Sequence, residues 1–82
     1  MVWFDYLWLE GDDGNIEHIA EHHLTMDDVE QVIENFEEDA VSSSTGRPIR
    51  FGYTSDGRYI AVVFEWIDEV TVYPVTAYEV ED

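Results

Sequence analysis

The sequence predicts an α+β fold in which an N-terminal strand precedes two short helices, packed on one face of a three- to five-stranded antiparallel β-meander. Periodicity is the first reason, because apolar residues recur at helical spacing early in the chain and alternate after Glu38. Turn residues are the second, because they divide the later part into short hairpin segments. Length is the third: 82 residues, 45% of them hydrophobic, suit a single domain over 1–82.

The first elements follow from residue types and turn signals. Val2 to Glu10 is aromatic and aliphatic, which predicts a strand, and the glycine-rich turn 11–14 ends it. Asn15 is then a suitable N-cap, so we expect a short helix over 15–23. Its core-facing positions would be Ile16, Ile19, Ala20 and His23, followed by Leu24 as an apolar plug.

The second helix has the clearest start signal. Thr25 can cap it, and Asp28 three residues later completes an acidic variant of the capping box. Apolar residues then repeat at helical spacing and give this helix an apolar stripe: Met26, Val29, Val32, Ile33 and Phe36.

The remainder predicts the meander. Strands are expected over 39–44, over 49–54 with Ile49, Phe51 and Tyr53 alternating with their neighbours, over 59–66, and over 70–78. Turns are expected at 44–46, 55–57 and 67–69. Pro74 interrupts the last strand, which indicates an edge position or a bulge.

Charge is the most unusual property of the composition. The chain has 20 acidic residues, three arginines and no lysine, for a net charge of −17. The arginines all fall within 47–58, so we expect Arg47, Arg50 and Arg58 to share one locality beside a hairpin. The acidity suits either a concentrated-salt environment, in which self-repulsion is screened, or a basic protein partner; it disfavours RNA without excluding it.

No feature predicts export or membrane insertion. The apolar N-terminal stretch is short and contains Asp5, unlike a signal peptide, and no run approaches the ~20 apolar residues of a membrane span. We therefore expect a soluble cytoplasmic protein.

Two motifs resemble metal sites. His18 and His22 with Glu21 match the H-x-x-E-H zinc pattern, but the short helix offers no third ligand. A calcium loop is the other reading, from the polar run Glu10, Asp12, Asp13, Asn15 and Glu17, although it lacks the D-x-D-x-D-G order. A solvated helix face and a solvated turn explain both, so we expect no metal or other cofactor.

Histidine, tyrosine and arginine are the residue types that can cleave RNA without metal, by proton transfer and by stabilising charge on the phosphate. The chain offers Arg47, Arg50, Arg58, His22, His23, Tyr53, Tyr73 and Tyr78. The alternative is structural: arginines that offset neighbouring carboxylates, and tyrosines packed with their hydroxyls in water.

The order of several segments resembles the BrnT family, the toxins of bacterial and archaeal toxin–antitoxin pairs with a RelE-type fold. The similar segments are Asn15 to Val29, Arg47, Gly52 to Arg58, Ala61 to Phe64, and Val75 to Ala77. The resemblance implies two helices on an antiparallel sheet, RNA cleavage that blocks translation, and a cognate antitoxin as partner.

The same resemblance implies the candidate catalytic residues. Arg58, Arg47 and His22 carry over from the family pattern, whereas Tyr73 and Tyr78 occupy places where the family has arginines. Arg58 would contact phosphate, and His22 or Tyr78 would transfer protons. Two functions therefore stay open: a BrnT-like ribonuclease, and a non-catalytic acidic module that binds a basic protein.

Overall fold

The computed structural model describes residues 4–80 and confirms the α+β class. In chain order the elements are β1 (Asp5–Tyr6), α1 (Asn15–Ala20), α2 (Met26–Glu34), β2 (Glu38–Val41), β3 (Pro48–Tyr53), β4 (Tyr59–Trp66) and β5 (Thr71–Glu79). The N-terminal strand is much shorter than expected, and its predicted residues Val2 and Trp3 lie outside the described part.

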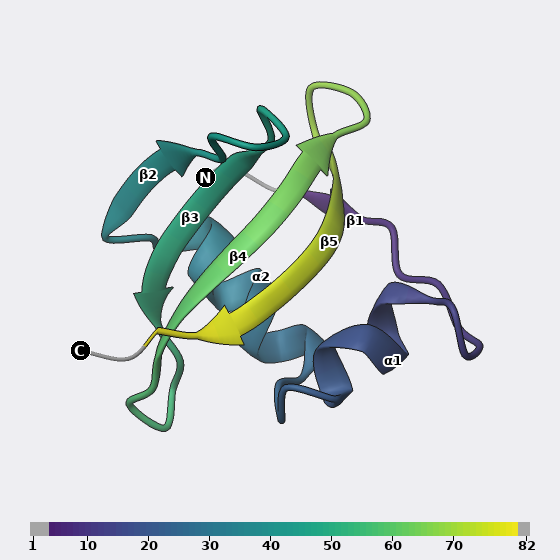
Figure 1. The fold of residues 1–82 in the computed structure, drawn as a ribbon, viewed down its shortest axis with the longest axis horizontal. Coiled ribbons are helices and arrows are strands. Elements are labelled where there is room, and N and C mark those ends of the chain that lie inside the picture. Colours follow the sequence, from purple (N-terminus) through teal and green to yellow (C-terminus); the bar gives the residue numbers. More distant parts are fainter. Residues whose placement is uncertain (1–3, 81–82) are drawn as a thin grey trace.

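The strands form one five-stranded sheet in the order β1-β5-β4-β3-β2 (Figure 1). Strands β2 to β5 make the expected antiparallel meander, while β1 adds to β5 in parallel, pairing Asp5 with Thr71 and Tyr6 with Val72. Both helices lie on the same side of the sheet. Among residues 4–80, no helix reaches the length and apolarity of a membrane span.

The core lies between this sheet side and the helices. Strand β4 turns Ile60, Val62 and Phe64 toward them, each with 0% of its surface exposed. The helices contribute the buried residues Ile19, Val29, Val32 and Ile33, and Leu24 plugs the connection between them. Since side chains alternate along a strand, the other set of β4 residues faces away from both helices.

Strand β3 turns the less apolar of its two alternating sets of side chains toward α2. Arg50, Gly52 and Thr54 share the helix side, and Ile49, Phe51 and Tyr53 face away. The reason is that α2 and the residues after it approach the backbone of β3 closely at Gly52. A Cβ on Gly52 would lie 3.3 Å from Cγ1 of Val32 and 3.5 Å from the carbonyl oxygen of Asn35. The helix therefore packs where β3 has no side chain.

The bulge expected at Pro74 is confirmed. The register between β4 and β5 shifts after Val63, which pairs with Thr76, because Phe64 pairs with Pro74. Val75 is the extra residue, and Pro74 lies past the end of the short β1, so its missing N–H costs the sheet no hydrogen bond.

The predicted role of Asn15 as an N-cap is wrong. Gly14 occupies that position, and Asn15 is the first helical residue, only 3% exposed. Its amide nitrogen donates to the carbonyls of Leu7 at 2.9 Å and Pro74 at 2.8 Å, and its oxygen accepts from the N–H of Leu9 at 2.7 Å. The side chain thus fastens the N-terminal segment to β5.

The first helix also ends earlier than expected, at Ala20 rather than His23. Residues 21–23 form a turn in which His23 adopts a left-handed backbone with φ of 62°. Ala20, the last residue of α1, and His23 in the turn are both exposed, although both were expected to face the core. The strand expected over 39–44 covers Glu38–Val41 instead, because the backbone of Ser42 already closes the following turn by donating to the carbonyl of Arg47.

The N-terminal segment, strand β1 and the residues just after it, is held to α2 by side-chain hydrogen bonds. The Tyr6 hydroxyl donates to Oε2 of Glu34 at 2.6 Å, and Nε1 of Trp8 donates to Oε2 of Glu30 at 2.8 Å. Burial first, and then the hydrogen bond to Glu34, raises the pKa of the Tyr6 phenol well above its usual value of 10.0.

We expect the Tyr6 phenol to stay protonated in the folded protein under alkaline conditions that ionise exposed tyrosines. Because its folded pKa is raised, its stabilising effect is complete below pH 10.0 and is lost as the pH rises above that value. Ultraviolet titration of wild type and Tyr6→Phe checks this. The two proteins should lose equal phenol signal until the wild type unfolds; a reversible ionisation near pH 10.0 that Tyr6→Phe lacks would contradict it.

Candidate functional site

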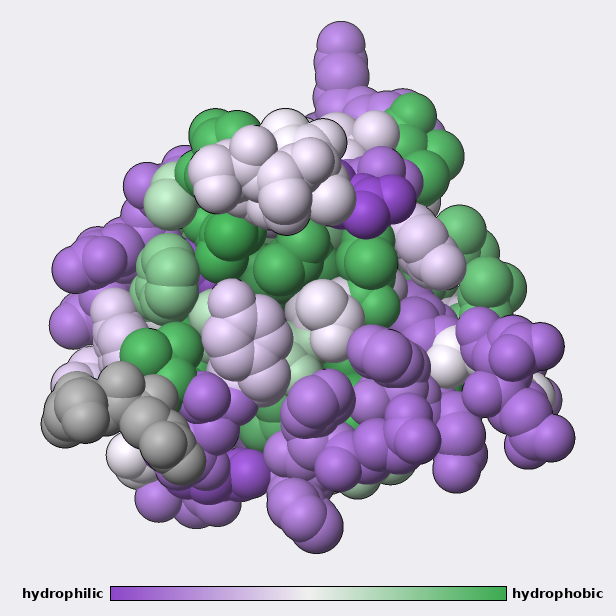
Figure 2. Space-filling model, viewed as in Figure 1, coloured by the Kyte–Doolittle hydropathy of each residue, from purple (hydrophilic) through white to green (hydrophobic). Residues whose placement is uncertain are grey.

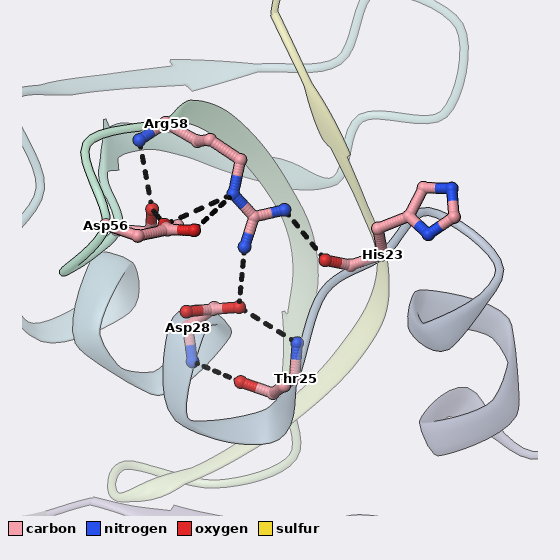
Figure 3. A network of polar contacts seen from close by, with 6 residues as sticks. His23, Thr25, Asp28, Asp56 and Arg58 are labelled. Carbon is pink, nitrogen blue, oxygen red and sulfur yellow. Dashed lines mark hydrogen bonds and ion pairs between the residues drawn. The ribbon is translucent and has the colours of Figure 1, made fainter.

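Arg58 anchors a polar network that joins the β3–β4 turn to the connection between the helices (Figure 3). Its Nε donates to both carboxylate oxygens of Asp56, at 3.0 and 3.2 Å. The terminal nitrogens donate to the carbonyl of His23 at 2.7 Å and to Oδ2 of Asp28 at 3.3 Å. Each of the three guanidinium nitrogens of Arg58 therefore donates to an acceptor within the chain.

The same network contains the predicted capping box. The Thr25 hydroxyl accepts from the Asp28 N–H at 3.2 Å, and Oδ2 of Asp28 accepts from the Thr25 N–H at 3.0 Å. The hydrogen bond from Thr54 and, to a smaller extent, the one from Arg58 lower the pKa of the Asp56 carboxyl. In turn, the hydrogen bond between Arg58 and Asp56 raises the pKa of the Arg58 guanidinium. These charged forms stabilise each other, so the arrangement favours a structural clamp.

The other two arginines also form hydrogen bonds within the protein. Nε of Arg47 donates to Oε1 of Glu65 at 2.8 Å. Arg50 lies on the helix side of the sheet, donates to the Ile33 carbonyl at 2.7 Å, and keeps its Nε buried without a partner. Its guanidinium carbon is 4.2 Å from the ring centroid of Phe36, which lies beyond the end of α2.

The expectation that the arginines share one locality is wrong. Arg47 precedes β3, whereas Arg58 follows its end, so the length of the strand separates them. Arg50 lies between these positions but points into the helix-covered side. Closeness in the sequence did not predict closeness in space, because an extended strand rises ~3.3 Å per residue and points successive side chains to opposite sides.

The five candidate catalytic residues fall in three places. Arg58 bonds to the carbonyl of His23, so it lies near the turn that carries the exposed His22. Arg47 and Tyr73 both adjoin Glu65, Arg47 by its ion pair and Tyr73 as the cross-strand partner. Tyr78 pairs with Ala61 on the sheet side away from the helices. The structure thus groups four of these residues in two pairs and leaves Tyr78 apart from both pairs.

The residues of the metal-like motifs have other contacts. Nδ1 of His18 is 3.8 Å from Oε2 of Glu21. The rings of His18 and His22 are arranged edge to face, with their centroids 5.8 Å apart. The Asn15 side chain is hydrogen-bonded to backbone groups of Leu7, Leu9 and Pro74. Within the described part of the chain, no three histidine, aspartate or glutamate residues are grouped so that they could hold a metal ion.

The sheet side away from the helices carries a continuous aromatic and aliphatic surface, which we call the open face. Its larger side chains are Ile49, Phe51, Tyr53, Tyr59, Val63, Tyr73 and Tyr78. Tyr53 and Tyr78 are 54% and 40% exposed. Figure 2 views this side and shows green and pale residues across its middle, with hydrophilic purple residues around them.

An acidic residue of β2 borders the open face. Glu38 is the cross-strand partner of Phe51 and therefore lies on this side. Burial, followed by the charges of Glu38, Tyr53 and Glu37, raises the pKa of the Tyr59 phenol. Glu38 thus places a carboxylate beside this aromatic surface, and Glu37 directly precedes it in the chain.

Sequence reasoning missed Phe51, Tyr59, Glu37 and Glu38 as site residues. The available signal was that both sets of alternating residues in β4 are apolar: Tyr59, Ala61 and Val63 on one side, and Ile60, Val62 and Phe64 on the other. Two helices lying on one side leave such a strand uncovered on the other.

The fold and this surface define a small α+β domain with one covered and one open sheet face. Comparison with protein-family models, with curated proteins and with solved structures finds no match.

The net charge of −17 predicts that stability rises with salt concentration. Carboxylates repel one another at low ionic strength, and the Debye length falls from about 10 Å at 0.1 M salt to about 3 Å at 1 M. Thermal unfolding in increasing sodium chloride should show a rising Tm. A Tm that is constant or falls over this range would contradict the prediction.

Proposed function

We propose that this protein is a non-catalytic binding module that engages a basic protein partner through the open face. The observation that supports the proposal most strongly is the surface itself: aromatic and aliphatic side chains on β3, β4 and β5 lie uncovered beside the Glu38 carboxylate of β2. Aromatic residues are enriched at the centres of protein interfaces, and complementary charge steers the encounter.

The state of the arginines supports a protein partner over RNA. Arg58, Arg47 and Arg50 are the whole arginine content of the chain, which has no lysine. Each donates to a carboxylate or a carbonyl within the protein. A phosphate would have to compete with these intramolecular acceptors while being repelled by a net charge of −17.

Affinity capture from the native host with matched variants tests the proposal. Three baits are used. They are the wild type, an open-face variant that carries Phe51→Ser and Tyr53→Ser, and a control variant that carries Met26→Ser at an exposed position of α2. Wild type and control should retain the same basic protein, and the open-face variant should lose it. Recovery that is equal for all baits would contradict the proposed surface.

An RNA-cleavage assay separates the two functions. Purified wild type and Arg58→Ala are incubated with bulk RNA at low and high salt. The binding module should leave the RNA intact in every condition. Cleavage by the wild type that Arg58→Ala abolishes would instead establish the BrnT-like ribonuclease function.

A further inference from the structure

Three aromatic rings gather at one end of the open face. The rings of Phe51 and Tyr59 stack with centroids 6.2 Å apart at an interplanar angle of 16°. Tyr53 is the cross-strand partner of Tyr59, with ring centroids 4.8 Å apart and tilted by 53°. Because Tyr53 is 54% exposed, the group presents aromatic surface to solvent.

One carboxylate that forms no ion pair among residues 4–80 lies beside these rings, and a second directly precedes it in the chain. Glu38 is the cross-strand partner of Phe51, and Glu37 precedes it in the chain. The ion pairs found among residues 4–80 use Glu21, Glu65, Asp28 and Asp56, so neither Glu37 nor Glu38 takes part in one there. Arg58 directly precedes Tyr59 but turns its guanidinium to the helix side.

The opposite side of the same strand pair already holds a guanidinium among three rings. The Arg50 guanidinium carbon lies 4.2, 5.3 and 5.7 Å from the ring centroids of Phe36, Phe64 and Trp66. Cations within about 6 Å of an aromatic ring are attracted by its quadrupole. At its Phe51–Tyr53–Tyr59 end, the open face repeats this environment with three rings and adds the Glu38 carboxylate. Among the described residues, no arginine makes a cation–π contact with these three rings.

We propose that Tyr53, Tyr59 and Phe51, together with Glu37 and Glu38, form a docking site for an arginine side chain of the basic partner. This inference rests on the proposed function and names the group that the open face recognises. A guanidinium lies flat against aromatic rings while its N–H groups reach carboxylate oxygens, which suits it to this site better than an ammonium group.

Titration of the isotopically labelled protein with short peptides, followed by NMR, tests the site. The probes are a peptide with one central arginine and the same peptide with lysine or with uncharged citrulline at that position. The arginine peptide should shift the signals of Tyr53, Tyr59 and Glu38 and bind more tightly than the lysine peptide. Citrulline should abolish these shifts, because it keeps the shape and loses the charge.

Matched variants separate the site from general attraction to an acidic protein. Glu37→Gln with Glu38→Gln should weaken arginine-peptide binding by roughly fivefold, as expected for losing two exposed charge interactions. The control, Glu17→Gln with Glu21→Gln, removes the same charge from exposed positions on α1 and the turn after it. Tyr53→Leu should weaken binding by about two- to fivefold, and Tyr53→Phe, which keeps a ring, should not.

Several results would overturn the site. These are equal weakening by the two glutamine variants, equal binding of the arginine and citrulline peptides, equal binding of the lysine peptide, or shifts centred away from β3 and β4. If such a result came while a basic partner still required Phe51 and Tyr53 in affinity capture, the docking function would stand and only the arginine site would fall.

Discussion

Replacing Asn15 with alanine is expected to destabilise the protein by about 2–4 kcal/mol, because buried groups would lose their hydrogen-bond partner. The side chain bonds to Leu7, Leu9 and Pro74, and the residue is 3% exposed. Alanine would leave the Leu9 N–H and the Pro74 carbonyl without these bonds. A domain of this size has roughly 4–12 kcal/mol of stability in total, so the loss is large.

Chemical denaturation of Asn15→Ala and Asn35→Ala measures the effect. Asn35 is an exposed asparagine whose amide makes one 3.4 Å bond to the Gln31 carbonyl, so its replacement should cost little. Equal and small losses for both variants would show that Asn15 does not fasten the N-terminal segment to β5.

Replacing Phe64 with alanine is expected to cost about 3–5 kcal/mol, the range for a large aromatic side chain removed from a core. Phe64 is 0% exposed, and its ring lies 5.3 Å from the Arg50 guanidinium carbon. The expected result is a large fall in Tm or loss of cooperative unfolding.

Tyr53→Ala is the matched control, because it removes an aromatic ring from the other side of the sheet. Tyr53 is 54% exposed, so its loss should cost under about 1 kcal/mol and leave the fold intact. The proposed function predicts the opposite order for partner binding, which Tyr53→Ala should weaken. If Tyr53→Ala unfolds the protein as readily as Phe64→Ala, the open face is part of the core and our assignment of the sheet sides is wrong.

Local signals in the sequence predicted much of the fold. The capping box of Thr25 and Asp28, the turn before Arg58 and the bulge at Pro74 each depend on residues close in the chain, and the structure contains all three. Asn15 was misassigned because its partners include Pro74, 59 positions away, and local spacing carries no trace of that contact. Likewise, the sequence did not indicate that β1 would pair in parallel with β5.

The candidate site was harder to predict than the fold. The arginines attracted attention because they are rare, yet strand geometry separates them and intramolecular acceptors occupy them. The open face depends on which side of β3 the helices cover. That choice follows from the close packing of α2 on Gly52, which leaves Phe51 and Tyr53 uncovered.

Photo-crosslinking in the native host tests the central claim most directly. A photoreactive phenylalanine analogue replaces Tyr53 on the open face, and a second variant carries it in place of the exposed Gln31 on α2. We predict that position 53 crosslinks to one basic protein and that position 31 does not. Crosslinking of a partner from position 31 alone, or from neither position, would contradict a binding role for the open face.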